Sequence, residues 1–138
     1  MNEKILGLLG LMRRANAIAI GTDQGGDAIR AGRGKLLLLA GDASDNVRRK
    51  GESLCEGRNI ERVPLSFGHE ELAKALGVSG CSMAVVTDLG FAQALTDLLA
   101  ADDPERYGDI AERVRLRKEK VVKRKALKGK KDRRNKED

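Results

Sequence analysis

Hydrophobic residues in the first fourteen positions recur at the spacing of an α-helix. Four of them, from Ile5 to Met12, fall at i, i+3, i+4 and i+7, so they share one helix face. The basic pair Arg13-Arg14 favours a helix end directly after them. Similar patterns, with Ser or Asp as N-terminal caps and glycines past the ends, predict four more helices. The five predicted helices cover residues 3–14, 23–31, 44–57, about 66–76 and 88 to about 99.

Four short apolar runs between these helices have the length of β-strands. Residues 35–40 hold four consecutive leucines and are closed by Gly41-Asp42, which suits a strand covered on both faces. Pro64 cannot donate a ladder hydrogen bond, so the run at 61–65 belongs at a sheet edge or a strand end. The predicted strands cover residues 17–20, 35–40, 61–65 and 82–87. Because helices alternate with strands, we predict an α/β fold, a three-layer α/β/α sandwich with a four-stranded sheet.

The composition changes at Asp102-Asp103-Pro104, where proline suits the first position of a new helix. After it, Tyr107, Ile110, Val114 and Val121 recur near a helical period, so this last helix should lie partly against the body. No apolar residue remains to bury from Lys128 onward, and we expect that end to be disordered. The expected organisation is one α/β/α domain over residues 1–103 and a basic C-terminal helix and tail over 104–138.

Positive charge is concentrated in this last segment. Residues 111–138 hold 14 Lys/Arg and 5 Asp/Glu, a net charge of +9, whereas the other 110 residues have a net charge of −3. A polycation attached to a nearly neutral body indicates a polyanionic partner, most often nucleic acid. The alternative is a solubilising end without a fixed partner.

Composition excludes several classes of protein. Aromatic residues make up 2% of the chain, which leaves little for base stacking on an aromatic platform. Two distant cysteines form neither a disulfide framework nor a metal knuckle, so a reducing cytoplasm is expected. The apolar run at residues 5–12 is too short for a membrane span and is not a convincing signal peptide. We therefore expect no membrane association, no cofactor and no metal.

Candidate catalytic residues are few. His69, the only histidine, stands at a predicted helix start beside two glutamates and is best explained as a solvated capping residue. Cys55 and Cys81 adjoin apolar residues and are best explained as small buried hydrophobes. The stretch from Asp42 to Asn46 resembles a calcium loop, but it lacks the required glycine and closing glutamate. These observations predict a protein that is not an enzyme.

Residues 21–26 form a glycine-rich turn from a strand into a helix. The sequence Gly-Thr-Asp-Gln-Gly-Gly matches neither a P-loop nor a dinucleotide-binding motif. It does place unsatisfied backbone N–H groups at a helix start, where the helix dipole attracts phosphate. Gly25 and Gly26 leave room for another backbone, Gln24 can donate to and accept from a base edge, and Asp23 can accept from guanine. An ordinary strand–helix turn is the alternative.

The order of these elements resembles the superfamily of archaeal ribosomal protein L-seven-Ae and its L-thirty-e relatives, and especially its small bacterial members of the YlxQ type. The resemblance covers residues 3 to about 100. Its matching segments are Lys-Ile-Leu-Gly-Leu-Leu at 4–9, Arg-Arg-Ala at 13–15, Gly-Thr-Asp-Gln at 21–24 leading to Ala-Ile-Arg-Ala-Gly at 28–32, residues 35–44, residues 71–77, and Val-Val-Thr-Asp at 85–88 with Phe91-Ala92.

This resemblance implies the same three-layer fold and binding to kinked RNA stems, called kink-turns. In the family a Gly-x-Asn-Glu motif at the start of the second helix contacts guanines in tandem sheared G·A pairs, with help from a lysine three residues later. A loop before the last strand covers a flipped-out nucleotide. The corresponding residues here are Gly21, Thr22, Asp23, Gln24 and Asp27, with Val78, Ser79, Gly80, Cys81 and Ser82 in the loop.

Three of these positions depart from the family motif. Asp23 stands in place of Asn, Gln24 in place of Glu and Asp27 in place of Lys. A lost bidentate base contact costs about 1–3 kcal/mol, and two carboxylates facing RNA oppose binding further. The fold prediction does not depend on these positions, whereas kink-turn specificity does.

The favoured hypothesis is a non-catalytic protein that binds structured RNA, ribosomal or another non-coding RNA, in association with the ribosome and as a monomer. The second helix, including Arg30, and the 78–82 loop would position the RNA. Phosphates would bind the basic residues Arg113, Arg115, Arg117, Lys118, Lys120, Lys123, Arg124 and Lys125. The alternative hypotheses are a protein-interaction module on the same fold and, less favoured, an accessory chain of an RNA-modifying enzyme.

Overall fold

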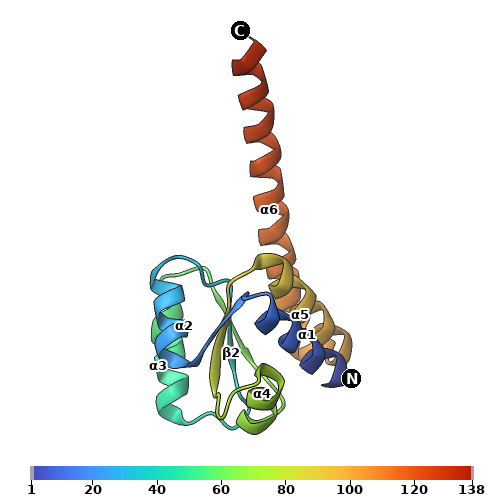
Figure 1. The fold of residues 1–138 in the computed structure, drawn as a ribbon. Coiled ribbons are helices and arrows are strands. Elements are labelled where there is room, and N and C mark those ends of the chain that lie inside the picture. Colours follow the sequence, from blue (N-terminus) through green and yellow to red (C-terminus); the bar gives the residue numbers. More distant parts are fainter. Residues whose placement is uncertain (1, 138) are drawn as a thin grey trace.

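The computed structural model describes the backbone of residues 2–137 and the side chains of residues 3–128. Helices and strands alternate along this part of the chain (Figure 1). The helices are α1 Asn2–Arg14, α2 Gly21–Arg30, α3 Asp45–Cys55, α4 His69–Leu76, α5 Leu89–Asp102 and α6 Pro104–Glu137; the strands are β1 Ile18–Ile20, β2 Leu36–Leu39, β3 Glu61–Pro64 and β4 Met83–Val86.

Local sequence signals account for most helix boundaries. The Ser44 hydroxyl accepts a hydrogen bond from the backbone N–H of Val47 at the start of α3, and an oxygen of Asp88 accepts one from Phe91 at the start of α5. Gly77 follows α4 with φ +71°, a conformation that glycine adopts without strain. These predicted caps are confirmed, but α2 begins at Gly21, two residues earlier than predicted.

The four strands form one mixed sheet in the order β1-β4-β2-β3. Strand β4 runs antiparallel to both β1 and β2, and β3 runs parallel to β2. Because β3 is an edge strand, Pro64 is tolerated there, as predicted.

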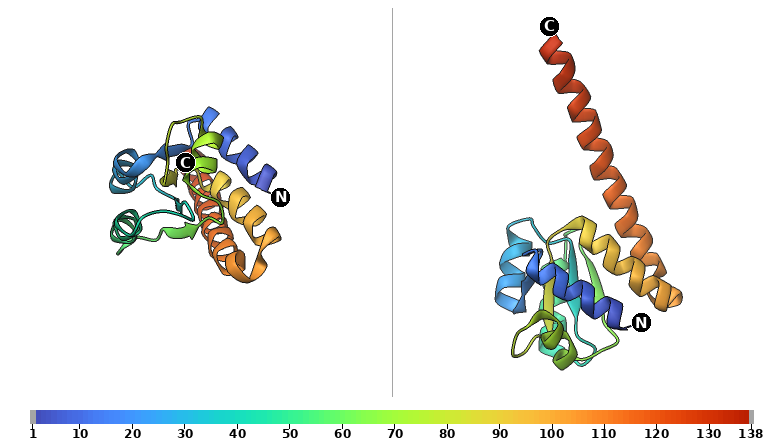
Figure 2. Two further views of the ribbon diagram at one scale, coloured as in Figure 1. Left: turned by 90° about the horizontal axis from the view of Figure 1, so that it is seen from below. Right: turned by 45° about the vertical axis from the view of Figure 1, so that its right-hand side comes forward.

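Helices cover both faces of this sheet, which confirms the predicted sandwich. The views in Figures 1 and 2 place α2 and α3 on one face and α1, α4, α5 and the first part of α6 on the other. Leu36 and Leu38 are buried on the face covered by α1, α4, α5 and α6, whereas Leu37 and Leu39 are buried under α2 and α3. This alternation is the period of two that a strand imposes.

The first third of α6 belongs to the body. Tyr107 is 3% exposed and Val114 is fully buried, and the Tyr107 hydroxyl donates to the Pro64 carbonyl at 2.5 Å. Beyond Lys118 the helix extends away from the sheet (Figure 1). Val121 is 36% exposed, so the prediction that it packs against the body is wrong.

The end of the chain also differs from expectation. The sequence predicts disorder from Lys128 onward, whereas α6 continues as a helix to Glu137. Residues 120–137 are rich in Lys and Arg, which favour helix, and contain no proline. Composition therefore permits a helix even where no apolar side chain anchors it.

Candidate nucleic-acid interface

The first turn of α2 follows β1 without a linker. Gly21 has φ +88°, a backbone conformation that only glycine adopts freely. The chain therefore turns from strand into helix within this one residue. Ile20 before it has no side-chain oxygen, and none of the side chains described caps this helix. Backbone N–H groups of the first turn are therefore available to an external acceptor, with the partial positive charge of the helix N-terminus behind them.

Residues 78–82 lie beside this helix start. The pairing of β1 with β4 sets Ile20 opposite Ala84, so Gly21 adjoins the segment that precedes β4. Burial raises the pKa of the Cys81 thiol, opposed by hydrogen bonds with the backbone of Gly21 and Met83. The structure thus brings together the two segments that the sequence singled out, residues 21–27 and 78–82, and we call this part of the molecule the α2 end.

The side chains in the 78–82 loop are not all at the surface. Cys81 is 5% exposed, and its Sγ donates to the Met83 carbonyl at 3.3 Å, so its side chain packs inside the body. Ser79 and Gly80 are exposed, and Val78 and Ser82 are half-buried. An approaching molecule can therefore contact the loop at these four positions.

The two glycines of α2 have internal packing roles. A Cβ on Gly25 would lie 3.0 Å from Val85 Cγ2 and 3.2 Å from Met83 Cε, so the absence of a side chain lets α2 pack closely on β4. A Cβ on Gly26 would lie 3.1 Å from a guanidinium nitrogen of Arg30. Both glycines are buried, and helix packing explains Gly25 without any external backbone.

Charged side chains on the outer face of α2 are partly paired. Arg30 donates to Asp27 at 3.0 Å, and both side chains are more than half exposed. An exposed ion pair of this kind contributes at most about 1 kcal/mol to stability. The Arg30 guanidinium can therefore leave the Asp27 carboxylate and bind a phosphate at little cost in free energy. Asp23 and Gln24 are exposed one turn earlier.

An aspartate–histidine pair lies at the same end of the sheet. Ala40 donates to the Ser82 carbonyl, which places the residues after β2 next to the loop. Asp42 accepts from the backbone N–H of His69 at 2.8 Å and lies 2.6 Å from its Nδ1. These contacts with His69 hold the pKa of Asp42 below its usual value. His69 lies at a helix start, as the sequence predicts, but its contact with Asp42, 27 residues away, was not predicted.

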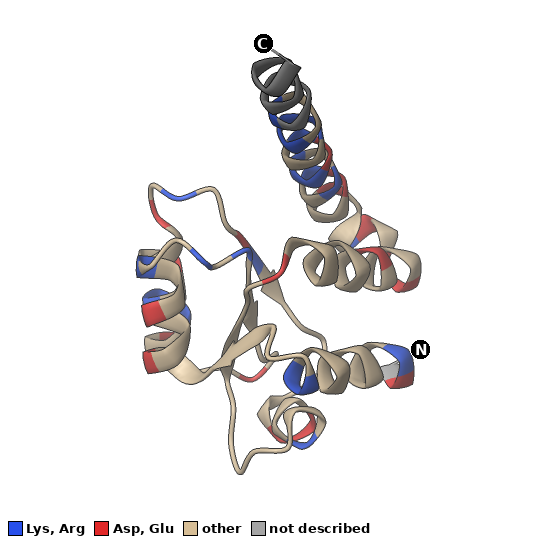
Figure 3. Cartoon of the chain, turned by 45° about the horizontal axis from the view of Figure 1, so that its top comes forward, with Lys and Arg blue, Asp and Glu red and all other residues tan. Residues whose placement is uncertain are grey.

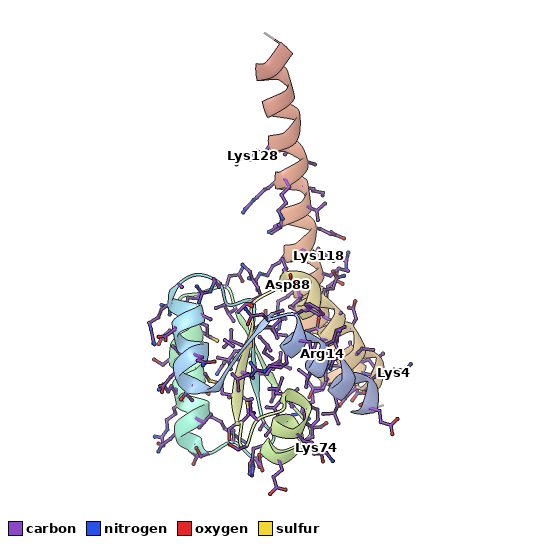
Figure 4. The ribbon with its side chains drawn as sticks, viewed as in Figure 1. Lys4, Arg14, Lys74, Asp88, Lys118 and Lys128 are labelled. Carbon is purple, nitrogen blue, oxygen red and sulfur yellow. The ribbon has the colours of Figure 1, made fainter. Side chains whose placement is uncertain are left out.

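Helix α6 leaves the body at the opposite end of the sheet. Arg117 donates to the Lys35 carbonyl at 3.4 Å, and Lys35 in turn donates to Val86, the last residue of β4. Loop 78–82 precedes β4, so the two ends are separated by that strand, about 14 Å at ~3.4 Å per residue. Figure 4 shows Lys118 and Asp88 at one end of the body and Lys74 at the other. We call the region of Lys35, Arg117 and the outer part of α6 the α6 end.

Three of the eight basic residues predicted to bind phosphate are engaged within the chain. Arg113 forms two hydrogen bonds to Glu61, of 2.6 and 3.1 Å, which raise the pKa of its guanidinium and fix α6 to β3. Arg115 pairs with Glu112 and Glu119, and Arg117 is half-buried. Among the described side chains, no ion pair involves the other five, which are Lys118, Lys120, Lys123, Arg124 and Lys125.

An open hollow of about 1350 Å³ follows the free edge of β3, between α3 and α6. Its lining mixes both charges: Arg62 pairs with Glu52 at 3.0 Å, and Arg113 with Glu61. Balanced charges of this kind give no net attraction for a polyanion.

The described part of the chain offers neither a metal site nor a membrane span. Within residues that the structure describes, no cluster of three His, Cys, Asp or Glu side chains could hold a metal ion. Nor is any of the described helices long and apolar enough to cross a membrane.

Comparison with known proteins shows which family and which relatives this chain resembles. The family model described as "Ribosomal protein L7Ae/L30e/S12e/Gadd45 family" matches residues 3–96. The RNA-binding protein YlxQ of Bacillus subtilis (strain 168) is 37% identical over 94 residues, which cover 67% of this chain and 91% of that protein.

Solved structures agree with the fold. A Bacillus halodurans C protein of unknown function superposes with a TM-score of 0.64 at 29% identity, covering 69% of this chain and 95% of its own. A Giardia lamblia 15.5kD RNA binding protein gives a TM-score of 0.56 at 21% identity, over 81% of this chain and 88% of its own, and this match supports the fold alone. The sequence matches by themselves confirm the predicted family resemblance and indicate a non-catalytic protein. The family match ends at residue 96, before α6 begins.

Proposed function

Because the chain belongs to the ribosomal protein L7Ae/L30e/S12e/Gadd45 family, we propose that it binds structured RNA through the α2 end, with α6 contacting phosphates. One observation carries the proposal: the uncapped start of α2 lies against the 78–82 loop, at the position implied by the resemblance. The description of the Bacillus subtilis relative as an RNA-binding protein supports the same class of ligand.

The proposed RNA is a kinked stem that exposes guanine edges. Backbone N–H groups at the start of α2 donate to phosphate or base oxygens, and the exposed Gln24 amide both donates and accepts. The Asp23 carboxylate accepts from guanine N–H groups. Exposed Ser79 and Gly80 lie in the loop beside these contacts, where an extruded nucleotide would be covered.

Charge limits the affinity of this end. Asp23 and Asp27 repel phosphate, and Arg30 offsets only one of them through its pair with Asp27. The exposed cations of α6 would therefore supply most of the attraction, and binding should weaken steeply as salt rises.

A double substitution, Asp23→Asn with Asp27→Lys, tests whether the α2 end recognises RNA shape. It introduces the amide and the lysine that the family motif has at these positions. We expect the preference for a kink-turn stem over a matched stem without the kink to rise about 10- to 100-fold, the equivalent of about 1–3 kcal/mol. Binding of both RNAs is measured by titration at fixed salt.

A control variant, Asp97→Asn with Glu105→Lys, changes the charge equally on exposed positions of α5 and α6. It should raise the affinity for both stems alike. An equal gain for both stems in the α2 variant would contradict shape recognition at this end. If no structured RNA binds the native protein at low ionic strength, the proposal fails and a protein-interaction module on the same fold is favoured.

A further inference from the structure

A cleft of about 360 Å³ opens at the α6 end, between the C-terminal ends of α2 and α3, the start of β2 and the side of α6. Four cationic side chains line it, and within the described residues no carboxylate does. The cations are Arg30, Lys35, Arg58 and Arg117. This composition differs from the hollow along β3, where the two charges alternate and pair.

Two of these cations have structural roles. Arg58 donates to the Leu54 carbonyl at 2.9 Å, in the last turn of α3, and Arg30 lies in the last turn of α2 and pairs with Asp27. Cations at helix C-termini stabilise the exposed carbonyl groups there. Helix capping therefore explains why these two arginines are present.

The other two cations lack such a role. Arg117 is half-buried, and its hydrogen bond to the Lys35 carbonyl is long, at 3.4 Å. Burial lowers the pKa of Arg117. The negative charge of Glu61 raises this pKa in part, but Glu61 is already hydrogen-bonded to Arg113. Lys35 is half-buried as well and forms no ion pair with any side chain that the structure describes. Two incompletely compensated cations beside two arginines repel one another, and a bound anion would relieve that repulsion.

The cleft is continuous with the basic part of α6. Arg117 belongs to both, and Lys118, Lys120 and the following cations continue along the helix away from the body. Arg33 is exposed and lies in the chain between Gly32 and Gly34, two residues of the lining. Figure 3 shows Lys and Arg positions on the loops at this end of the body and along α6. A linear polyanion fits this arrangement better than a single small anion does, because the cations continue along α6 beyond the cleft.

We propose that Lys35, Arg58 and Arg117 bind the phosphodiester backbone of RNA in this cleft and direct it along α6, as a contact separate from the α2 end. This proposal rests on the proposed function, since it takes RNA as the ligand. It adds a second surface, at the other end of β4, that contacts backbone rather than base edges.

The test uses the full chain with Lys35→Gln and Arg58→Gln, and as probe a short blunt RNA duplex without bulge or kink. Each lost phosphate contact lowers the salt dependence, so the slope of log K against log[salt] should become shallower by about 1.4–1.8. Lys35→Arg with Arg58→Lys keeps both charges and should keep the native slope. Lys4→Gln with Lys50→Gln removes two exposed cations from α1 and α3, outside the cleft, and should leave the slope unchanged. Thermal unfolding identifies any loss of folded protein.

The outcomes separate the two proposals. A native slope for the Lys35/Arg58 glutamine variant overturns the cleft proposal, and binding of the kinked stem by that variant leaves the proposed function standing. Absence of RNA binding by the native protein overturns both. If the variant loses binding of inorganic phosphate but keeps its affinity for the duplex, the cleft holds a small anion, and its assignment to RNA backbone is wrong.

Discussion

The two ends of the sheet differ in the kind of group that they present. At the α2 end, the carboxylates of Asp23 and Asp27 are exposed, with Asp42 and His69 at the same end of the sheet, and the available donors are backbone N–H groups. At the α6 end, cations line a cleft and continue along a helix. Under the proposed function, one small domain separates geometric recognition, which needs fixed donors, from electrostatic attraction, which needs only charge.

Strand β4 connects these ends. All four of its residues are buried, and it pairs with both β1 and β2. Its surroundings are therefore close-packed, and the distance from the 78–82 loop to the base of α6 is fixed by the sheet. An RNA that contacts both ends must run along the body between them. Because the ends are separate, a substitution at one end measures the contribution of that end to RNA affinity.

Removal of the outer part of α6 should have the largest effect. Residues 120–138 hold ten Lys/Arg and three Asp/Glu. If they neutralise about five phosphates, a chain ending at Glu119 should lose about 4 from the slope of log K against log[salt], and at least ~100-fold in RNA affinity at low salt. Salt titrations of the two chains measure both quantities.

Stability is the control for this truncation. The chain ending at Glu119 keeps Val114, which is the last fully buried residue among the described side chains of α6, and it should unfold at the native temperature. A chain ending at Ile110 loses Val114 and should unfold at a lower temperature. Undiminished RNA affinity in the Glu119 chain would show that the outer part of α6 contributes little.

At the α2 end, Gly25→Ala should reduce stability by about 1–3 kcal/mol, because its Cβ would press on Val85 and Met83. Gly7→Ala is the matched control: it lies within α1 with nothing within 4 Å of the new Cβ, and it should stabilise the chain by about 0.5–1 kcal/mol. Chemical denaturation measures both changes. Equal effects of the two substitutions would refute the close packing of α2 on β4.

Two double substitutions that each remove two positive charges from α6 test the distinction between paired and exposed cations. Lys123→Gln with Lys125→Gln should lower the salt slope by about 1.4–1.8 and leave stability unchanged. Arg113→Gln with Arg115→Gln removes the same charge, but it breaks the pairs with Glu61, Glu112 and Glu119, so it should lower stability slightly and change the slope less. Identical slopes for the two variants would contradict this division.

The smallest effect concerns acid stability. His69 holds the pKa of Asp42 below its ordinary value of 3.8, so the folded state binds a proton less readily than the unfolded chain. The contribution of this pair is therefore present above pH 3.8 and disappears as the pH falls through the lower pKa of the folded state. In unfolding experiments from pH 6 to pH 2, Asp42→Asn should differ from the native chain at the upper end and converge with it at the lower end. The control Asp97→Asn, on exposed α5, should follow the native curve throughout.

Local patterns in the sequence were sufficient to predict the elements of the body. The leucine run at 36–39 is buried on both faces, Pro64 lies on the edge strand, and Ser44, Gly77 and Asp88 mark helix ends as expected. Each prediction depended on groups within a few residues of one another: side-chain period, a capping oxygen or a permitted φ. Val121 was misassigned because periodicity identifies a helix face but not where the neighbouring layer ends.

The family resemblance extended these predictions to the α2 end, since both 21–27 and 78–82 could be located by motif. Their contact could not be derived from periodicity, because it depends on β1 pairing with β4 across some sixty residues of chain. The same holds for Asp42 with His69 and for Glu61 with Arg113, whose partners lie 27 and 52 residues apart.

The amino-acid sequence by itself determined the helices and strands, the two apolar faces of the sheet and the concentration of positive charge near the C-terminus, because these follow from the order of neighbouring residues. Only the tertiary structure decided which cations are paired, why Gly25 is required, and that the helix start and the basic helix lie at opposite ends of β4. Those properties depend on strand order and register, which are fixed by packing between segments far apart in the chain.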